Sequence, residues 1–168
     1  MRGSFLLLLL VSLLPLADFL RPGLPVTHDG PDHVVRLASF YQSLAEGNLV
    51  PRWAGNLNWG YGHPVVMFFY PLPNYLGSLF HFFGLSFIDS VKAVFVLSFV
   101  LSGIFMYWWV KEHWGERAGL AAAVVWLLAP YRLVDLYVRG AIGECLAFAW
   151  PPLIGYLALK LSKTFGVS

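Results

Sequence analysis

The chain has 168 residues, of which 58% are apolar and only 12% are charged, and its mean hydropathy is +0.67. A soluble domain carries about twice that share of charged residues, so the composition excludes an ordinary soluble globule and predicts an integral membrane protein. The net charge of +2 is too small to indicate nucleic-acid binding, and a single cysteine, Cys145, excludes an internal disulfide or a cysteine metal cluster.

The N-terminal segment predicts a first membrane helix over residues 4–20. A membrane span needs about 20 apolar residues, or about 17 at the short limit, and this run meets the short limit. A secretory signal is the alternative, because Arg2 precedes the apolar stretch and the small residue Ala17 lies near its end. No small-x-small cleavage site follows, and the apolar run continues to Leu20, so we interpret the segment as an uncleaved helix.

Residues 21–90 predict a large outer loop that contains helices beside the membrane. Gly30-Pro31 suits the first turn of a helix, and apolar residues then recur at helical spacing until Gly47, which predicts an amphipathic helix on the membrane surface. Residues 65–85 are apolar but are interrupted by prolines and crowded by aromatic side chains. This pattern favours an interfacial or re-entrant segment over a fifth membrane span.

Three further membrane helices are predicted, over residues 91–110, 118–130 and 145–160. Their direction follows from the basic residues, because cytoplasmic loops carry an excess of lysine and arginine. A cytoplasmic N-terminus with four spans gives every cytoplasmic segment basic residues, which are Arg2, Lys111, Arg117, Lys160 and Lys163.

The predicted fold class is therefore an all-α membrane protein with four spans, forming a single membrane domain over residues 1–168. In this topology the loops 21–90 and 131–144 both face outward. If residues 65–85 crossed the membrane, the loop 131–144 would face the cytoplasm instead.

The densest polar group follows the first helix and contains His28, Asp29, Asp32 and His33, with Arg36 one turn later. In one interpretation Asp29 caps the amphipathic helix while Asp32 pairs with Arg36. In a second, the two imidazoles and two carboxylates hold a divalent metal, although their spacing matches no specific metal signature. In a third, Asp32 is a general base or an electrostatic partner in a site that faces the membrane.

A second polar group precedes the last predicted helix. Its members are Tyr131, Arg132, Asp135, Tyr137, Arg139 and Glu144. One interpretation is an interfacial loop anchored by tyrosines, in which Asp135 and Arg139 pair. Glu144 favours a functional interpretation, because it leads directly into an apolar helix, where a carboxylate is costly. Carboxylates in both groups, with arginines between them, suit a lipid substrate that carries phosphate, which arginine binds bidentately.

Several motifs resemble a bacterial family labelled "membrane protein, 6-pyruvoyl-tetrahydropterin synthase-related". More broadly, the chain is similar to the GT-C class of polytopic glycosyltransferases, which use polyprenyl-phosphate-linked sugars. The resemblance covers residues from about 25 to 155. It rests on Asp32-His33 with Arg36, Pro51-Arg52-Trp53, Gly60-Tyr61-Gly62-x-Pro64, Phe69-Tyr70-Pro71-Leu72, and Pro130-Tyr131 with Tyr137-x-Arg139-Gly140-Ala141 and Glu144.

The resemblance implies an inner-membrane glycosyltransferase with its site on the outer face. Asp32 matches an acidic residue in the family's first outer loop, and Glu144 occupies the comparable place in the next one, so both are implied to be catalytic. The implied substrate-binding residues are His33, Arg36, Arg52, Tyr137 and Arg139. Membrane lipid and a polyprenyl-phosphate-linked sugar are the expected partners. The only cofactor considered is the alternative divalent metal at residues 28–33.

Proteins of this family run to several hundred residues with more spans, so the chain resembles the N-terminal portion of one. The rival hypothesis is a non-enzymatic membrane scaffold or partner subunit, whose polar loops are helix caps and interface anchors. A transporter is less favoured, since no charged residue lies at the middle of a predicted span, where transport pathways usually place one.

Overall fold

The computed structural model describes residues 2–166, with side chains from Leu6 onward. The predicted domain 1–168 also includes Met1, Val167 and Ser168, which lie outside the described residues. The described part is helical and contains no strand, apart from an isolated backbone bridge between Ala54 and His63. The expected all-α fold class is confirmed.

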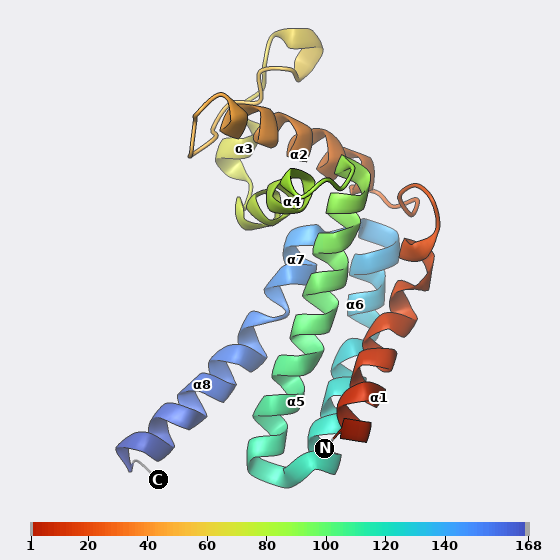
Figure 1. Ribbon diagram of the computed structural model, residues 1–168, viewed down its shortest axis with the longest axis vertical. Helices are drawn as coiled ribbons and strands as arrows, with labels where there is room; N and C mark the ends of the chain where they lie inside the picture. Colours follow the sequence, from red (N-terminus) through yellow and green to blue (C-terminus); the bar gives the residue numbers. More distant parts are fainter. Residues whose placement is uncertain (1, 167–168) are drawn as a thin grey trace.

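The helices form two sets (Figure 1). One set runs along the long axis of the molecule, and α2 and α4 lie across one end of it. In chain order the elements are α1 (Arg2–Leu13), η1 (Leu14–Leu20), α2 (Gly30–Ala45), η2 (Asn58–Gly60), α3 (Val65–Phe68), α4 (Leu72–Phe82), α5 (Phe87–Leu127), α6 (Pro130–Val134), η3 (Asp135–Arg139), α7 (Ile142–Ala147) and α8 (Trp150–Phe165).

The long element α5 reverses direction at Gly115, where the backbone has φ 83° and ψ 179°. These angles favour glycine because a Cβ atom would clash there. Past the reversal the two halves pack side by side: a Cβ added to Gly103 would lie 2.8 Å from Leu127, and one added to Gly119 would lie 2.8 Å from the carbonyl oxygen of Tyr107. The predicted helices 91–110 and 118–130 therefore form an antiparallel pair.

Two described helices are long and apolar enough to cross a membrane, and they cover Phe87–Leu127 and Ile142–Phe165. The apolar helix Leu6–Leu20 is shorter. Length and composition thus indicate two membrane helices, against the four predicted spans. The numbers differ because two predicted spans lie within α5 on either side of its reversal, and because the first predicted span is short.

The outer loop forms the predicted amphipathic helix, α2, which begins at Gly30 as expected and ends at Ala45. The apolar face of α2 packs on α4. Gly77 of α4 lies directly against the Leu37 side chain, and the ring centroids of Phe40 and Tyr75 are 4.9 Å apart. Residues 65–85 form the short helices α3 and α4 rather than one long one, because prolines interrupt the sequence between them.

The main core lies between α1, α5 and the segment after α6. Its enclosed side chains, each at most 5% exposed, include Leu8, Leu16, Phe19, Leu37, Phe95, Phe99, Tyr107, Leu127 and Leu136. Small residues let the helices approach closely, as is typical of helix contacts in membranes.

This close packing makes a sterically specific prediction at Gly119. Gly119→Ala places a methyl group 2.8 Å from a backbone oxygen, which cannot move aside as a side chain can. We expect a loss of about 1–3 kcal/mol in the free energy of unfolding, typical of overpacking. Thermal unfolding of the purified chain measures it. Gly55→Ala is the control, since nothing lies within 4 Å of a Cβ there, and equal stability of the two variants would contradict the packing.

Candidate functional site

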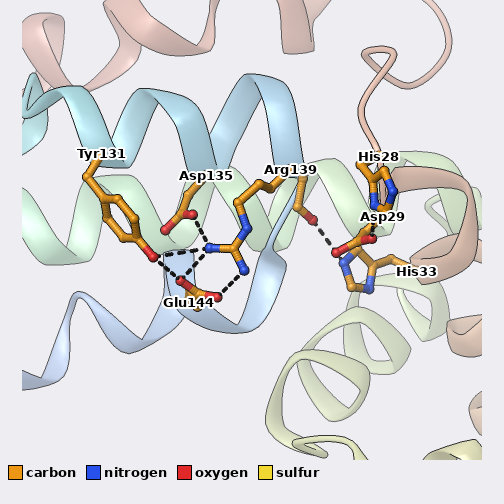
Figure 2. Close-up of polar contacts among 8 residues, drawn as sticks. His28, Asp29, His33, Tyr131, Asp135, Arg139 and Glu144 are labelled. Carbon is orange, nitrogen blue, oxygen red and sulfur yellow. Dashed lines mark hydrogen bonds and ion pairs between the residues drawn. The ribbon is translucent and has the colours of Figure 1, made fainter.

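Three hydrogen bonds join the two polar groups, several of whose side chains are shown in Figure 2. The backbone N–H of His28 donates to the Val138 carbonyl at 2.9 Å, and that of Asp29 donates to the Arg139 carbonyl at 2.8 Å. The Nε2 atom of His33 lies 2.9 Å from the Gly140 carbonyl oxygen. A carbonyl only accepts, so we assign the His33 proton to Nε2. The structure thus brings together segments separated by more than a hundred residues.

Arg139 is the centre of the second polar group. Its guanidinium contacts Asp135 at 2.7 Å and both carboxylate oxygens of Glu144, at 2.8 and 2.5 Å. The Tyr131 hydroxyl donates to Glu144 at 2.8 Å. The predicted pairing of Asp135 with Arg139 is present, and Glu144 shares the same arginine. The cluster of Asp135, Arg139 and Glu144 therefore combines two carboxylates with one guanidinium.

Asp135 is the least accessible member of this cluster, because its side chain is 0% exposed. Burial raises the pKa of this carboxyl, and the nearby Glu144 raises it further, while Arg139 opposes both effects. Its Oδ2 atom has no hydrogen-bond partner among the described residues. Arg139 is thus the group that offsets the cost of enclosing the Asp135 charge.

The first polar group has a different geometry. Asp32 is 64% exposed and bonds Arg36 at 3.1 Å, as the i,i+4 spacing predicts. The Arg36 guanidinium also stacks over the Phe69 ring, 4.1 Å from its centroid. One of its five N–H donors is used on Asp32, so others remain for a ligand.

The predicted cap of α2 needs correction. Asp29 occupies the capping position but makes no side-chain cap; its carboxylate lies 2.7 Å from the His28 ring instead. The Thr27 hydroxyl accepts the Gly30 N–H at 3.1 Å and takes over this role. Asp29 has helical backbone angles, φ −102° and ψ −6°, whereas a residue whose side chain caps a helix typically has extended ones.

The metal alternative at His28, Asp29, Asp32 and His33 is not supported by the geometry. His33 is directed at a backbone carbonyl, and Asp32 at Arg36. Across residues 2–166, no three His, Cys, Asp or Glu side chains come close enough to hold a metal ion.

Two predicted substrate-binding residues lie away from the joined groups. The Tyr137 hydroxyl donates to the Pro15 carbonyl, and its ring packs edge-on against Phe19, with 6.3 Å between the ring centroids. Tyr137 therefore holds η3 against η1. Arg52 is exposed and makes no hydrogen bond or ion pair in the described part of the chain. Sequence spacing alone could not show that these two residues differ from the other predicted binding residues, because a motif does not show where a side chain points.

Tyr70 was not among the predicted site residues. The sequence placed it in an aromatic interfacial segment, whose alternative role was to receive a polyprenyl chain or an acceptor sugar. Its ring lies directly on Gly143, where an added Cβ would come within 2.2 Å of it. Tyr70 therefore places the Phe69–Tyr70 segment beside Glu144. Burial raises the pKa of the Tyr70 hydroxyl, so the residue is a neutral hydrogen-bonding group at neutral pH. In the sequence, the sign of this contact was Gly143, because a glycine immediately before Glu144 leaves room for a ring to pack there.

Two cavities adjoin these residues. An apolar groove of about 290 Å³ lies where α4, α7 and α8 meet, and Glu144 is the charged residue in its lining. Tyr70, Leu72, Leu146 and Trp150 supply much of its wall. A more polar cavity of about 350 Å³ contains Asp32 and Arg36.

Arg132 is enclosed more completely than either polar group. It is 1% exposed, donates to the Ser102 hydroxyl at 2.8 Å, and stacks 4.4 Å from the Phe99 centroid and 4.7 Å from that of Phe148. Its Nε and Nη2 atoms have no hydrogen-bond partner among the described residues. Arg132 lies away from both cavities and has a structural place in the core.

Comparison with known proteins finds a bacterial relative of this chain. The chain is 25% identical over 155 residues to a protein of Lactococcus lactis subsp. cremoris (strain MG1363) that is described as "Uncharacterized protein". The match covers 89% of this chain and 25% of that protein, so the chain spans about a quarter of the relative's length. No protein-family profile and no solved structure matches the chain. The family resemblance stays a prediction.

The buried carboxylate predicts unequal effects of removing the two arginines. Arg139→Gln leaves Asp135 enclosed without its counter-charge, and we expect Tm to fall by about 6–12 °C. Arg36→Gln breaks a pair whose acid is exposed, and we expect a fall of about 2 °C. Thermal unfolding of both variants in the same detergent checks this. Equal losses would show that Asp135 does not depend on Arg139.

His33 predicts a dependence of stability on pH. Burial lowers the pKa of its imidazole, and Arg36 lowers it further, so the folded chain takes up this proton at a lower pH than the unfolded chain does. The free energy of unfolding therefore decreases as pH falls below about 6.5, by at most about 1.4 kcal/mol per pH unit. Unfolding curves between about pH 7.5 and 5.5 measure it.

Two variants make this test specific to His33. His33→Gln removes the titrating group, so we expect its unfolding free energy to change less over that pH range. His28→Gln is the control, because the His28 side chain is 85% exposed, and it should keep the slope of the unaltered chain. A slope that persists in His33→Gln would assign the pH dependence to another residue.

Proposed function

We propose that the chain is part of a membrane glycosyltransferase that takes its sugar from a polyprenyl phosphate carrier. The observation that carries this proposal is the apolar groove of about 290 Å³ that ends at Glu144. A polyprenyl phosphate joins an apolar chain to a charged headgroup, so its site needs apolar surface beside a few placed polar groups. The groove supplies the apolar surface, and Glu144 connects it to the joined polar groups.

The proposal includes a topology of four crossings in the bacterial inner membrane, with the N-terminus in the cytoplasm. Figure 1 places the start of α1, the reversal of α5 and the end of α8 at one end of the molecule, and α2, α4 and α7 towards the other. Lys160 and Lys163, which bond Glu112 at 3.0 and 2.8 Å, lie at the end with the reversal. Basic residues at that end support its assignment to the cytoplasm.

In the proposed reaction the acceptor hydroxyl oxygen attacks the anomeric carbon of the donor sugar. The bond from that carbon to the phosphate oxygen breaks, and the lipid phosphate leaves with the electron pair. Asp32 receives the proton of the acceptor hydroxyl, which suits a carboxylate that is 64% exposed and has one side-chain partner. Glu144 and Tyr70 line the donor groove and orient the headgroup.

Arg36 is the residue proposed to neutralise the leaving phosphate. Its guanidinium is held by Asp32 and by the Phe69 ring, and it retains N–H donors that a phosphate can accept. Arg139 is less suited to this role, because Asp135 and Glu144 already occupy it. We assign Arg139 to the positioning of Glu144.

A membrane scaffold or partner subunit is the second candidate. The mutual pairing of Asp135, Arg139 and Glu144 favours it, because charges that satisfy one another need no ligand. In this case Asp32 and Arg36 would be a surface ion pair on α2, and the groove would hold membrane lipid without selecting its headgroup.

Farnesyl phosphate, a short polyprenyl phosphate, separates the two candidates. A ligand that binds only the folded chain stabilises it, by about 2.7 kcal/mol at a hundred times Kd. We expect farnesyl phosphate to raise Tm of the purified chain and farnesol to raise it less, since farnesol lacks the phosphate. Arg36→Gln should remove the difference between the two ligands. No stabilisation by either ligand would favour the scaffold.

A substitution within the groove locates the binding. Ala147→Trp fills the groove and should abolish the response to farnesyl phosphate. Val125→Trp is the matched control, because Val125 is 72% exposed and lies outside this groove, so the response should be retained. Loss of the response in both variants would place the ligand elsewhere on the apolar surface.

A further inference from the structure

A short hairpin projects beyond α2 at the end of the molecule where the polar groups meet (Figure 1). Its base is closed by two backbone hydrogen bonds between Ala54 and His63, of 2.9 and 3.0 Å. Its tip carries Trp59, which is 94% exposed, and Tyr61, which is 84% exposed. Large aromatic surface held in this way is typical of a recognition site rather than of a core.

The hairpin is held firmly in this position. The Trp53 ring packs on Gly62, and the Ser39 hydroxyl of α2 donates to the Asn56 side chain. At the tip, both Asn58 and Trp59 adopt a φ of 54°, in the left-handed region. This conformation is uncommon for tryptophan. Strained backbone of this kind clusters at ligand-binding sites, so the tip is a candidate for recognition.

The polar cavity of about 350 Å³ lies between this hairpin and α2. Asp32 and Arg36 line it from the helix, and Leu57, Asn58 and His63 line it from the hairpin. The Nδ1 atom of His63 accepts the Val65 N–H at 3.0 Å, so a neutral His63 carries its proton on Nε2 and can donate with it. The cavity therefore offers both donors and acceptors.

This lining suits a ligand rich in hydroxyl groups. Each hydroxyl both donates and accepts, which Asp32, Arg36 and Asn58 can satisfy between them. Sugar rings also present C–H faces that stack on aromatic side chains such as Trp59. An apolar protein surface fits less well, because it would leave the cavity's polar groups unpaired.

We propose that this cavity and the aromatic hairpin bind a carbohydrate, which is the acceptor of the transfer reaction. The inference rests on the proposed function, which left the acceptor open. Arg36 lines the polar cavity and stacks on Phe69, and the next residue, Tyr70, lines the apolar groove. The Phe69–Tyr70 segment thus links the acceptor cavity to the donor groove.

Saturation-transfer NMR with the chain in lipid nanodiscs tests this with four probes, the methyl glycosides of glucose, galactose, mannose and N-acetylglucosamine. We expect at least one probe to bind, and Trp59→Ala to weaken it about two- to tenfold, as loss of an aromatic contact does. Trp114→Ala is the control, since Trp114 is 70% exposed at the opposite end of the molecule, next to the α5 reversal. This variant should bind the probe as the unaltered chain does.

A second variant separates ligand contact from folding of the hairpin. Asn58→Gly keeps the φ of 54°, which glycine adopts freely, and removes the side chain of a residue that lines the cavity. It should weaken the same probe. The proposal would be overturned if both Trp59→Ala and Asn58→Gly bound the probe as strongly as the unaltered chain does. It would also be overturned if none of the four probes bound.

The outcomes are distinct from those of the donor experiment. Trp59→Ala should still be stabilised by farnesyl phosphate, because Trp59 is absent from the apolar groove. If farnesyl phosphate binds and no glycoside does, the acceptor inference fails while the proposed donor site stands. A shift from dimer to monomer in Trp59→Ala by analytical ultracentrifugation, without glycoside binding, would instead assign the hairpin to contact between copies of the chain.

Discussion

The arrangement of both cavities depends on three hydrogen bonds that join residues 28–33 to the backbone of residues 138–140, called the joint below. The N–H groups of His28 and Asp29 bond the carbonyls of residues 138 and 139, and His33 bonds that of Gly140. These carbonyls lie at the end of η3, where a helix leaves backbone groups without partners. The joint satisfies them and fixes where α2 begins, so Asp32 and Glu144 come to lie at the same end of the molecule. The His33 bond is buried, so breaking it would leave a polar group unpaired.

Sequence patterns anticipated the elements better than their arrangement. The period of apolar residues predicted α2 from Gly30. The prolines within residues 65–85 indicated an interrupted segment, and this segment forms the short helices α3 and α4. Both signals are local, because each residue acts on its own turn of backbone. The reversal at Gly115 brings Leu127 against Gly103, a contact that depends on shape complementarity between distant segments. No local pattern encodes such a contact.

The candidate site shows the same division between local and distant information. The pairs Asp32–Arg36 and Asp135–Arg139 follow from i,i+4 spacing and are present. The third interaction of Arg139, with Glu144, crosses from η3 to α7 and changes the role of the arginine. Tyr137 and Arg139 are two residues apart in one motif, yet only a structure shows that they point to different neighbours. Residue types predicted the chemistry of the region, whereas the assignment of each side chain required the fold.

The enclosure of Arg132 has a consequence for how the chain is assembled. Its guanidinium stacks on Phe99, which the ribosome makes earlier, and on Phe148, which it makes later. A buried cation is costly without partners, so the place of Arg132 is complete only once both rings are present. The segment around α6 therefore packs into its final position together with the segment around Phe148, and not before it.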